Sequence, residues 1–85
     1  MPAKLLVLAN KADKNLSKLP LKIQKRILEA FHKIKNNPMS GIKLHGQLNQ
    51  FYKYRVGDYR IVYFLDTKKN RIEVLKIEHR QGVYK

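Results

Sequence analysis

The chain has 85 residues, and its 19 lysines and arginines against six aspartates and glutamates give a formal net charge of +13. This length allows one domain, spanning residues 1–85, with a single small core. The charge indicates an acidic partner, of which nucleic acid is the commonest. The absence of cysteine excludes disulfides and thiolate metal sites, and no apolar run is long enough for a secretory signal or a membrane span, so we expect a soluble cytoplasmic protein.

The first half of the chain predicts one strand followed by two helices. A short apolar run at residues 5–8 favours a buried strand, because it is too brief for most helices. Apolar residues at helical spacing predict a short helix over about 10–19. A longer apolar stripe at residues 23–34 predicts a second helix, which should end just before Pro38 because proline disfavours helical geometry in the residue that precedes it.

The second half predicts three consecutive strands. After an irregular segment at residues 43–48, the sequence FYKYRVGDYRIVYFL at 51–65 alternates as a β-hairpin does, and a turn near 67–70 leads to a last strand over 71–79. The order strand, helix, helix, strand, strand, strand predicts an α+β fold. We expect a small, mainly antiparallel sheet with both helices packed on one face and the other face open to a ligand.

The hairpin places positive charges opposite one another. If Gly57 and Asp58 are the central turn residues, antiparallel pairing sets Arg55 across from Arg60, and Lys53 points from the same face. Like charges at opposed positions weaken a sheet, so their presence indicates a function outside folding. The simplest such function is binding of an anion, and phosphate is the first candidate.

Alternation also divides the apolar residues of the hairpin between its two faces. The helix-bearing face receives Tyr52, Tyr54, Val56, Tyr59, Ile61, Tyr63 and Leu65. The open face receives Phe51, Lys53, Arg55, Arg60, Val62 and Phe64. Each open-face residue alone could be part of an ordinary solvated basic surface. Together they resemble a site for single-stranded nucleic acid, with cations for phosphates and rings for bases.

Other polar residues carry weaker signals. The segment after the last strand adds His79, Arg80 and Tyr84, either as a frayed tail or as a turn that returns to the sheet. His32 and His45 lack partners at ligand spacing. The carboxylates are spread along the chain with no cluster on the hairpin face, so we expect neither a metal site nor a cofactor.

Three segments, "KLHGQL", "YKYRVGDYRIVY" and "IEHRQGVYK", occur in this order, and with them the chain resembles the RelE/ParE toxin superfamily, specifically its RelE-like ribosome-dependent mRNA interferases. The resemblance implies a toxin of a type II toxin-antitoxin system. Such a toxin is an endoribonuclease that cleaves mRNA in the ribosomal A site and inhibits translation. An acidic antitoxin neutralises it in a hetero-oligomer.

The resemblance also implies roles for individual residues. By position, Lys53, Arg55, Arg60, Arg80 and Tyr84 match the catalytic set of the family. Many relatives have lysine at the place of Arg55, where it has been considered a general base, whereas a guanidinium stays protonated at any working pH. Lys53 is then the first candidate, because the two neighbouring arginines disfavour the charged form of an amine.

Further assignments complete this set. Tyr84 is the second candidate for the base, Arg80 is expected to assist the leaving oxygen, and His79 is a possible additional member. Phe51, Phe64 and Lys43 are predicted to contact RNA. Two alternatives stay open: a ParE-like inhibitor of DNA gyrase with the same fold, and a non-catalytic RNA-binding domain. The presence of all five catalytic matches favours the interferase.

Overall fold

The computed structural model describes residues 2–44 and 50–79 of the chain. Its elements follow in the order β1 (Leu5–Leu8), α1 (Asn10–Ser17), α2 (Leu21–Asn36), the 3₁₀ helix η1 (Pro38–Ser40), β2 (Ile42–Lys43), β3 (Phe51–Val56), β4 (Tyr59–Asp66) and β5 (Arg71–His79). The predicted first strand, both helices and the final three strands are confirmed. The prediction that the first strand is buried is wrong, because β1 lies at the edge of the sheet and is exposed at Leu5 and only partly buried elsewhere. The short strand β2 was not predicted and begins one residue before the segment expected to be irregular. Within the described ranges, no helix is long and apolar enough to cross a membrane.

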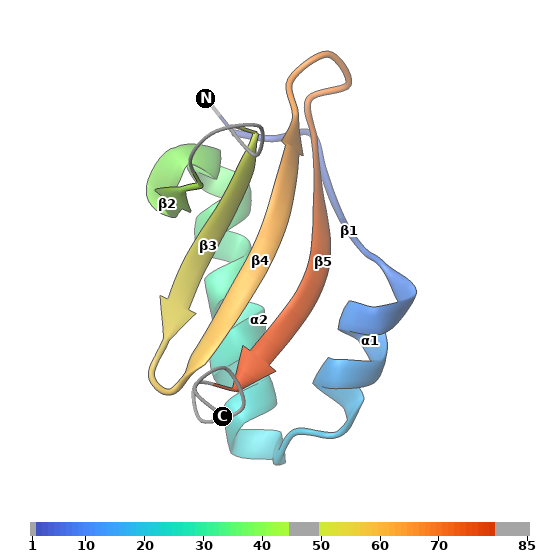
Figure 1. Cartoon of the computed structure of the whole chain (residues 1–85), viewed down its shortest axis with the longest axis vertical. Coiled ribbons are helices and arrows are strands. Elements are labelled where there is room, and N and C mark those ends of the chain that lie inside the picture. Colours follow the sequence, from blue (N-terminus) through green and yellow to red (C-terminus); the bar gives the residue numbers. More distant parts are fainter. Residues whose placement is uncertain (1, 45–49, 80–85) are drawn as a thin grey trace.

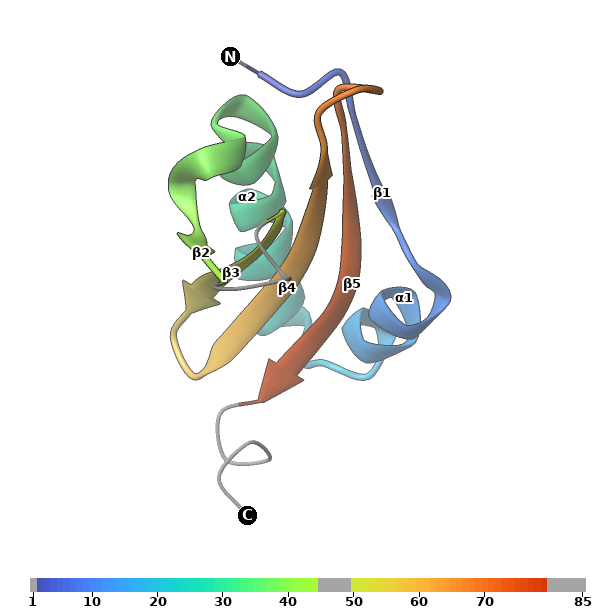
Figure 2. The same cartoon turned by 45° about the horizontal axis from the view of Figure 1, so that its top comes forward.

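The strands form one mixed sheet in the order β1-β5-β4-β3-β2. β1 runs parallel to β5, and the remaining neighbours are antiparallel. Figure 1 shows α2 behind the sheet and α1 beside β5, and the turned view in Figure 2 shows α2 still behind β3 and β4 and α1 clear of the strands. In the described part of the chain, no helix covers the opposite face. The predicted α+β arrangement with one open sheet face is therefore confirmed.

The core lies between α2 and the inner face of the sheet. The apolar stripe of α2 buries Ile27, Ala30, Phe31 and Ile34, as its helical spacing predicts. The strands contribute Tyr52, Ile61, Tyr63, Leu65, Ile72, Val74 and Ile77. The hairpin residues assigned to the helix-bearing face are thus buried or pack against this core.

A β-bulge in β5 changes which of its side chains face the core. Tyr63 pairs with Val74, whereas the preceding Val62 pairs with Lys76, so Leu75 is an extra residue on β5. Val74 and Ile77 are consequently both buried although they are three positions apart. Without the bulge, strict alternation from Val74 would turn Lys76 toward the helices. The bulge instead turns Lys76 toward the open face.

Helix α1 covers the part of the β5 edge that β1 leaves unpaired. β1 pairs with β5 only as far as Val74, and the Ala9 backbone N–H donates to the Val74 carbonyl at 2.9 Å. Beyond that point the Asn15 side-chain oxygen accepts a hydrogen bond from the Ile77 N–H at 3.0 Å. A backbone donor that the sheet cannot satisfy is therefore paired by a side chain from α1.

Candidate active site

The turn between β3 and β4 sets the register of the hairpin. Gly57 has a φ of +58°, the left-handed conformation that a tight hairpin turn requires and that glycine adopts without steric cost. Arg55 pairs with Arg60 and Val56 with Tyr59. The predicted opposition of the two arginines is confirmed.

Three cations from the hairpin converge on one cleft. Lys53, Arg55 and Arg60 line a cavity of about 400 Å³. Its remaining walls are Ser40, Gly41 and Ile42 from the η1–β2 segment and Tyr54, Gly57, Asp58 and Tyr59 from the hairpin. Arg55 is exposed, and its Nε donates to the Gly57 carbonyl at 3.3 Å. The guanidinium of Arg55 is thereby drawn back toward the turn.

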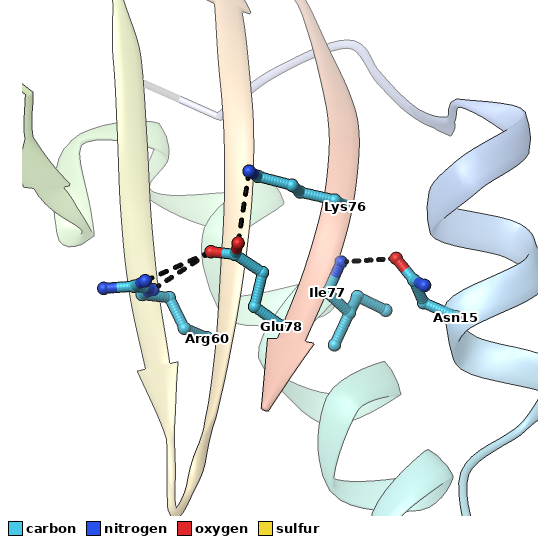
Figure 3. A network of polar contacts seen from close by, with 5 residues as sticks. All are labelled: Asn15, Arg60, Lys76, Ile77 and Glu78. Atoms are coloured by element: carbon cyan, nitrogen blue, oxygen red, sulfur yellow. Dashed lines mark hydrogen bonds and ion pairs between the residues drawn. The ribbon is translucent and has the colours of Figure 1, made fainter. Parts of the chain in front are cut away.

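Arg60 also has an acidic partner on the neighbouring strand. Glu78 pairs with Arg60 across β4 and β5, and its Oε1 lies 3.2 Å from Arg60 Nη2 and accepts from Arg60 Nε at 3.3 Å. The Glu78 Oε2 lies 3.1 Å from Lys76 Nζ, so the carboxylate bridges two cations (Figure 3). Partial burial alone would raise the pKa of Glu78, but Lys76 and Arg60 together hold that pKa below its usual value.

The wall of the cleft opposite β3 is held by a buried phenol. The Tyr63 hydroxyl donates to the Pro38 carbonyl at 2.6 Å and accepts from the Gly41 N–H at 3.2 Å. Burial raises the pKa of Tyr63 to about 12. Gly41 approaches closely, since a Cβ at that position would lie 2.7 Å from both the Lys53 carbonyl oxygen and the Tyr63 hydroxyl. This packing holds the η1–β2 segment beside Lys53.

An aromatic pair lies farther along the open face. Phe51 and Phe64 are directly opposed at the end of the hairpin away from its turn, and their ring centroids are 5.1 Å apart at a tilt of 54°. Both side chains are half-buried. A ring surface and a cation-lined cleft thus share one face of the sheet, as the alternation of the sequence predicts.

Two predicted site residues lie away from this cluster. Lys43 pairs with Tyr52, a residue of the helix-bearing face, while its neighbour Ile42 pairs with Lys53. His79 pairs with Tyr59, and their rings meet edge to face at 4.7 Å. Because cross-strand partners share a face, the register places Lys43 and His79 on the side opposite Lys53 and Arg60. The predicted site residues Arg80 and Tyr84 lie outside the described residues, as does His45, which was not predicted to be part of the site.

Sequence reasoning missed four residues that shape this cleft. Lys76 and Glu78 reach the open face only because of the bulge, and Tyr63 and Gly41 fix the cleft wall through contacts between distant segments. A usable signal for the bulge was the change of apolar spacing from Ile72–Val74 to Val74–Ile77. Within residues 2–44 and 50–79, no three His, Asp or Glu side chains group in a way that could hold a metal ion.

Comparison with known proteins places this fold in the class of small toxins found in toxin-antitoxin systems. "Toxin RelE" of Mycobacterium tuberculosis is 36% identical over 76 residues, which cover 87% of this chain and 78% of the relative. The toxin-antitoxin complex RelBE2 of the same organism contains a chain with a TM-score of 0.82 and 28% identity, covering 94% of this chain and 93% of that one. The archaeal RelE–RelB complex of Pyrococcus horikoshii gives a TM-score of 0.78 and 29% identity, with 94% and 97% of the two chains covered.

A family model described as "ParE toxin of type II toxin-antitoxin system, parDE" matches residues 6–84. The chain therefore belongs to this family, within the RelE/ParE toxin superfamily, and is a toxin of a type II toxin-antitoxin system. The resemblance to the RelE/ParE toxin superfamily, stated from the sequence motifs, is confirmed.

Proposed function

We propose that this toxin is a ribosome-dependent endoribonuclease that binds mRNA on the open face of its sheet and cleaves it in the ribosomal A site. The observation that carries the proposal is the convergence of Lys53, Arg55 and Arg60 on one cleft. Three cations at one place fit the phosphate backbone, and the nearby Phe51–Phe64 pair offers a surface on which a base can stack. The relatives named RelE support the same choice.

The proposed chemistry uses the RNA as its own nucleophile and needs no metal ion. The 2′-hydroxyl beside the scissile phosphate loses its proton, its oxygen bonds to phosphorus, and the bond from phosphorus to the 5′-oxygen breaks. The products are a 2′,3′-cyclic phosphate and a 5′-hydroxyl that takes up a proton. Arg55 and Arg60 bind the non-bridging oxygens and stabilise the added negative charge of the pentacoordinate state.

Proton transfer is assigned to other residues of the predicted catalytic set. Lys53 is the first candidate for the base, and Tyr84 is the second. Arg80 is proposed to stabilise the leaving 5′-oxygen. The roles of Arg80 and Tyr84 rest on the family resemblance. His79 is not retained in this set, because its pairing with Tyr59 places it on the other side of the sheet.

The ribosome and an antitoxin complete the proposed system. Positioning of the mRNA by the ribosome supplies the in-line geometry, so free RNA should be cleaved poorly, and cleavage stops translation in the cytoplasm. The two solved structures compared above are toxin-antitoxin complexes. For a chain of net charge +13, we propose an acidic antitoxin that covers the basic face in a hetero-oligomer.

The proposal is tested with purified toxin and ribosomes stalled on a defined mRNA. Arg60→Ala should slow single-turnover cleavage by about 10²–10³-fold, the usual effect of removing one transition-state donor, and Lys53→Met should slow it as well. Lys68→Ala is the matched control, because Lys68 is an exposed cation in the turn between β4 and β5. Unchanged rates in the first two variants would contradict the proposed site. Binding without products that carry cyclic phosphate would indicate a non-catalytic RNA-binding domain.

A ParE-like inhibitor of DNA gyrase is the second candidate, because the matching family model is described as a ParE toxin. The two functions are separable in one pair of assays. Inhibition of gyrase supercoiling by the wild-type protein, together with no cleavage of ribosome-bound mRNA, would reverse our choice.

A further inference from the structure

The contact between Glu78 and Arg60 leaves part of the arginine available. A guanidinium has five N–H donors, and the Glu78 Oε1 faces only the edge formed by Nε and Nη2, at 3.3 and 3.2 Å. Figure 3 shows the remaining end of the guanidinium directed away from Glu78 and lying over β3. Because Lys53 and Arg55 come from β3, the outer donors of Arg60 point toward the other cations of the cleft.

The contact between Glu78 and Arg60 offsets an electrostatic repulsion between Arg60 and Arg55. Arg55 and Arg60 are paired across the hairpin, and two guanidiniums in that position repel each other. A repelled arginine on the sheet surface would swing toward solvent and lose its alignment. The Glu78 carboxylate is an attractive charge on the far side of Arg60 from Arg55, and it offsets the repulsion without occupying the space between the two arginines.

Glu78 is itself held in place. Its second oxygen lies 3.1 Å from Lys76 Nζ, and its side chain is 27% exposed. The Glu78 backbone is fixed by pairing with Arg60 after the bulge. Lys76 and Arg60 therefore restrain the two carboxylate oxygens separately, and the carboxyl group has a defined orientation along the sheet.

We infer that Glu78 is a positioning residue, which clamps the inner edge of Arg60 so that the outer donors of the guanidinium face the scissile phosphate. Lys76 supports this clamp by holding the other carboxylate oxygen. The inference rests on the proposed ribonuclease function, because it assigns Glu78 a role that acts through Arg60. Glu78 itself does not touch the RNA.

The first test compares two glutamates of β5. Glu78→Gln keeps the shape of the side chain and removes its charge, while Glu73→Gln removes the same charge from the same strand at a position opposite Phe64. Single-turnover cleavage of ribosome-bound mRNA should fall about 10- to 100-fold in Glu78→Gln, the scale expected when a catalytic group loses its alignment. Glu73→Gln should stay within about twofold of wild type, and the half-saturating ribosome concentration should change little in either variant.

A double-variant cycle separates positioning from a general effect on the fold. If Glu78 acts only through Arg60, Glu78→Gln should cause no further loss in a protein that already carries Arg60→Ala. A purely structural defect would instead slow both backgrounds by the same factor, and that result would overturn the inference. A faster rate in Glu78→Gln would overturn it too, because Glu78 would then be competing with the RNA phosphate for Arg60.

Hydrogen exchange in the free toxin tests the contact between Glu78 and Arg60 independently of catalysis. The Arg60 Nε–H proton, assigned by its disappearance in Arg60→Lys, should exchange slowly with water in NMR spectra of the wild type and of Glu73→Gln. It should exchange at least about fivefold faster in Glu78→Gln, since replacing a charge-assisted hydrogen bond by a neutral one costs about 1 kcal/mol, which corresponds to that factor. Equal exchange in all three proteins would overturn the clamp. If the wild type cleaves no ribosome-bound mRNA, the proposed function fails, while the exchange data still decide whether Glu78 positions Arg60.

Discussion

Replacing Tyr63 by phenylalanine tests how the wall of the cleft is held. The Tyr63 side chain is fully buried, and its hydroxyl bonds the Pro38 carbonyl at 2.6 Å and the Gly41 N–H at 3.2 Å. Tyr63→Phe leaves the ring in place and removes both hydrogen bonds. A buried backbone group without a partner costs about 1–3 kcal/mol. Because Pro38 is buried and Gly41 is half-buried, we expect a loss of about 2–4 kcal/mol in the free energy of unfolding.

The matched control for this experiment is Tyr52→Phe. Tyr52 is also buried and stacks on Tyr63 with ring centroids 5.4 Å apart, but its hydroxyl makes no hydrogen bond within the described part of the chain. Urea unfolding of the three proteins at pH 7 should give Tyr52→Phe within about 0.5 kcal/mol of the wild type. Equal stabilities of the two variants would refute the reasoning, because the bonds to Pro38 and Gly41 would then contribute nothing.

Three further predictions follow from the same contacts. Gly41→Ala should destabilise the protein by about 1–3 kcal/mol in urea unfolding, because its Cβ would lie 2.7 Å from the Lys53 carbonyl and the Tyr63 hydroxyl; wild-type stability would contradict this packing. The stability advantage of the wild type over Tyr63→Phe should be complete below pH 10, the ordinary pKa of tyrosine, and should fall as the pH rises toward 12, since the folded state keeps the phenol neutral. The two-unit shift corresponds to about 2–3 kcal/mol, and an advantage independent of pH would count against it. Arg55→Gln should stabilise the fold by about 0.2–1 kcal/mol at low salt and less at high salt, because it removes a like-charge pair; the same variant should slow cleavage, and a destabilised variant would show that the two arginines do not repel.

The hairpin was predictable because its structure depends on local rules. A glycine at the turn fixes the register, and alternation with a period of two then assigns each side chain to a face. Arg55 and Arg60 are neighbours in space only through that register. For this reason the cationic part of the candidate site could be placed from the sequence, including Lys53.

The acidic part of the site could not be placed in the same way. An extra residue at Leu75 reverses the alternation of β5, and only this reversal brings Lys76 and Glu78 to the open face. The spacing of the apolar residues of β5 reflects this change of alternation, since the buried residues Val74 and Ile77 are three positions apart. A reading of β5 as a strictly alternating strand misses this bulge, because such a reading places Lys76 among the core positions.

Tyr63 shows a different limit of sequence reasoning. Alternation assigns its ring correctly to the core, but the partner of its hydroxyl is the Pro38 carbonyl, 25 residues away in the chain. The short strand β2 depends on the same long-range packing, because Gly41 must pass close to Lys53 before Ile42 can pair with it. Neither contact leaves a periodic signal in the sequence.

The position of β4 in the sheet explains how the fold tolerates opposed arginines. An isolated two-stranded hairpin is marginal in water even without like charges across it, and here β4 also pairs with β5 along its length. On the inner face the stacked Tyr52 and Tyr63 hold β3 to β4, while on the outer face Glu78 of β5 attracts Arg60 away from Arg55. β5 thus stabilises the hairpin by pairing with β4, and it also carries the Glu78 carboxylate that orients Arg60. Stability and alignment of the cleft should consequently respond together to changes in β5, although β5 supplies none of the residues that line the cleft.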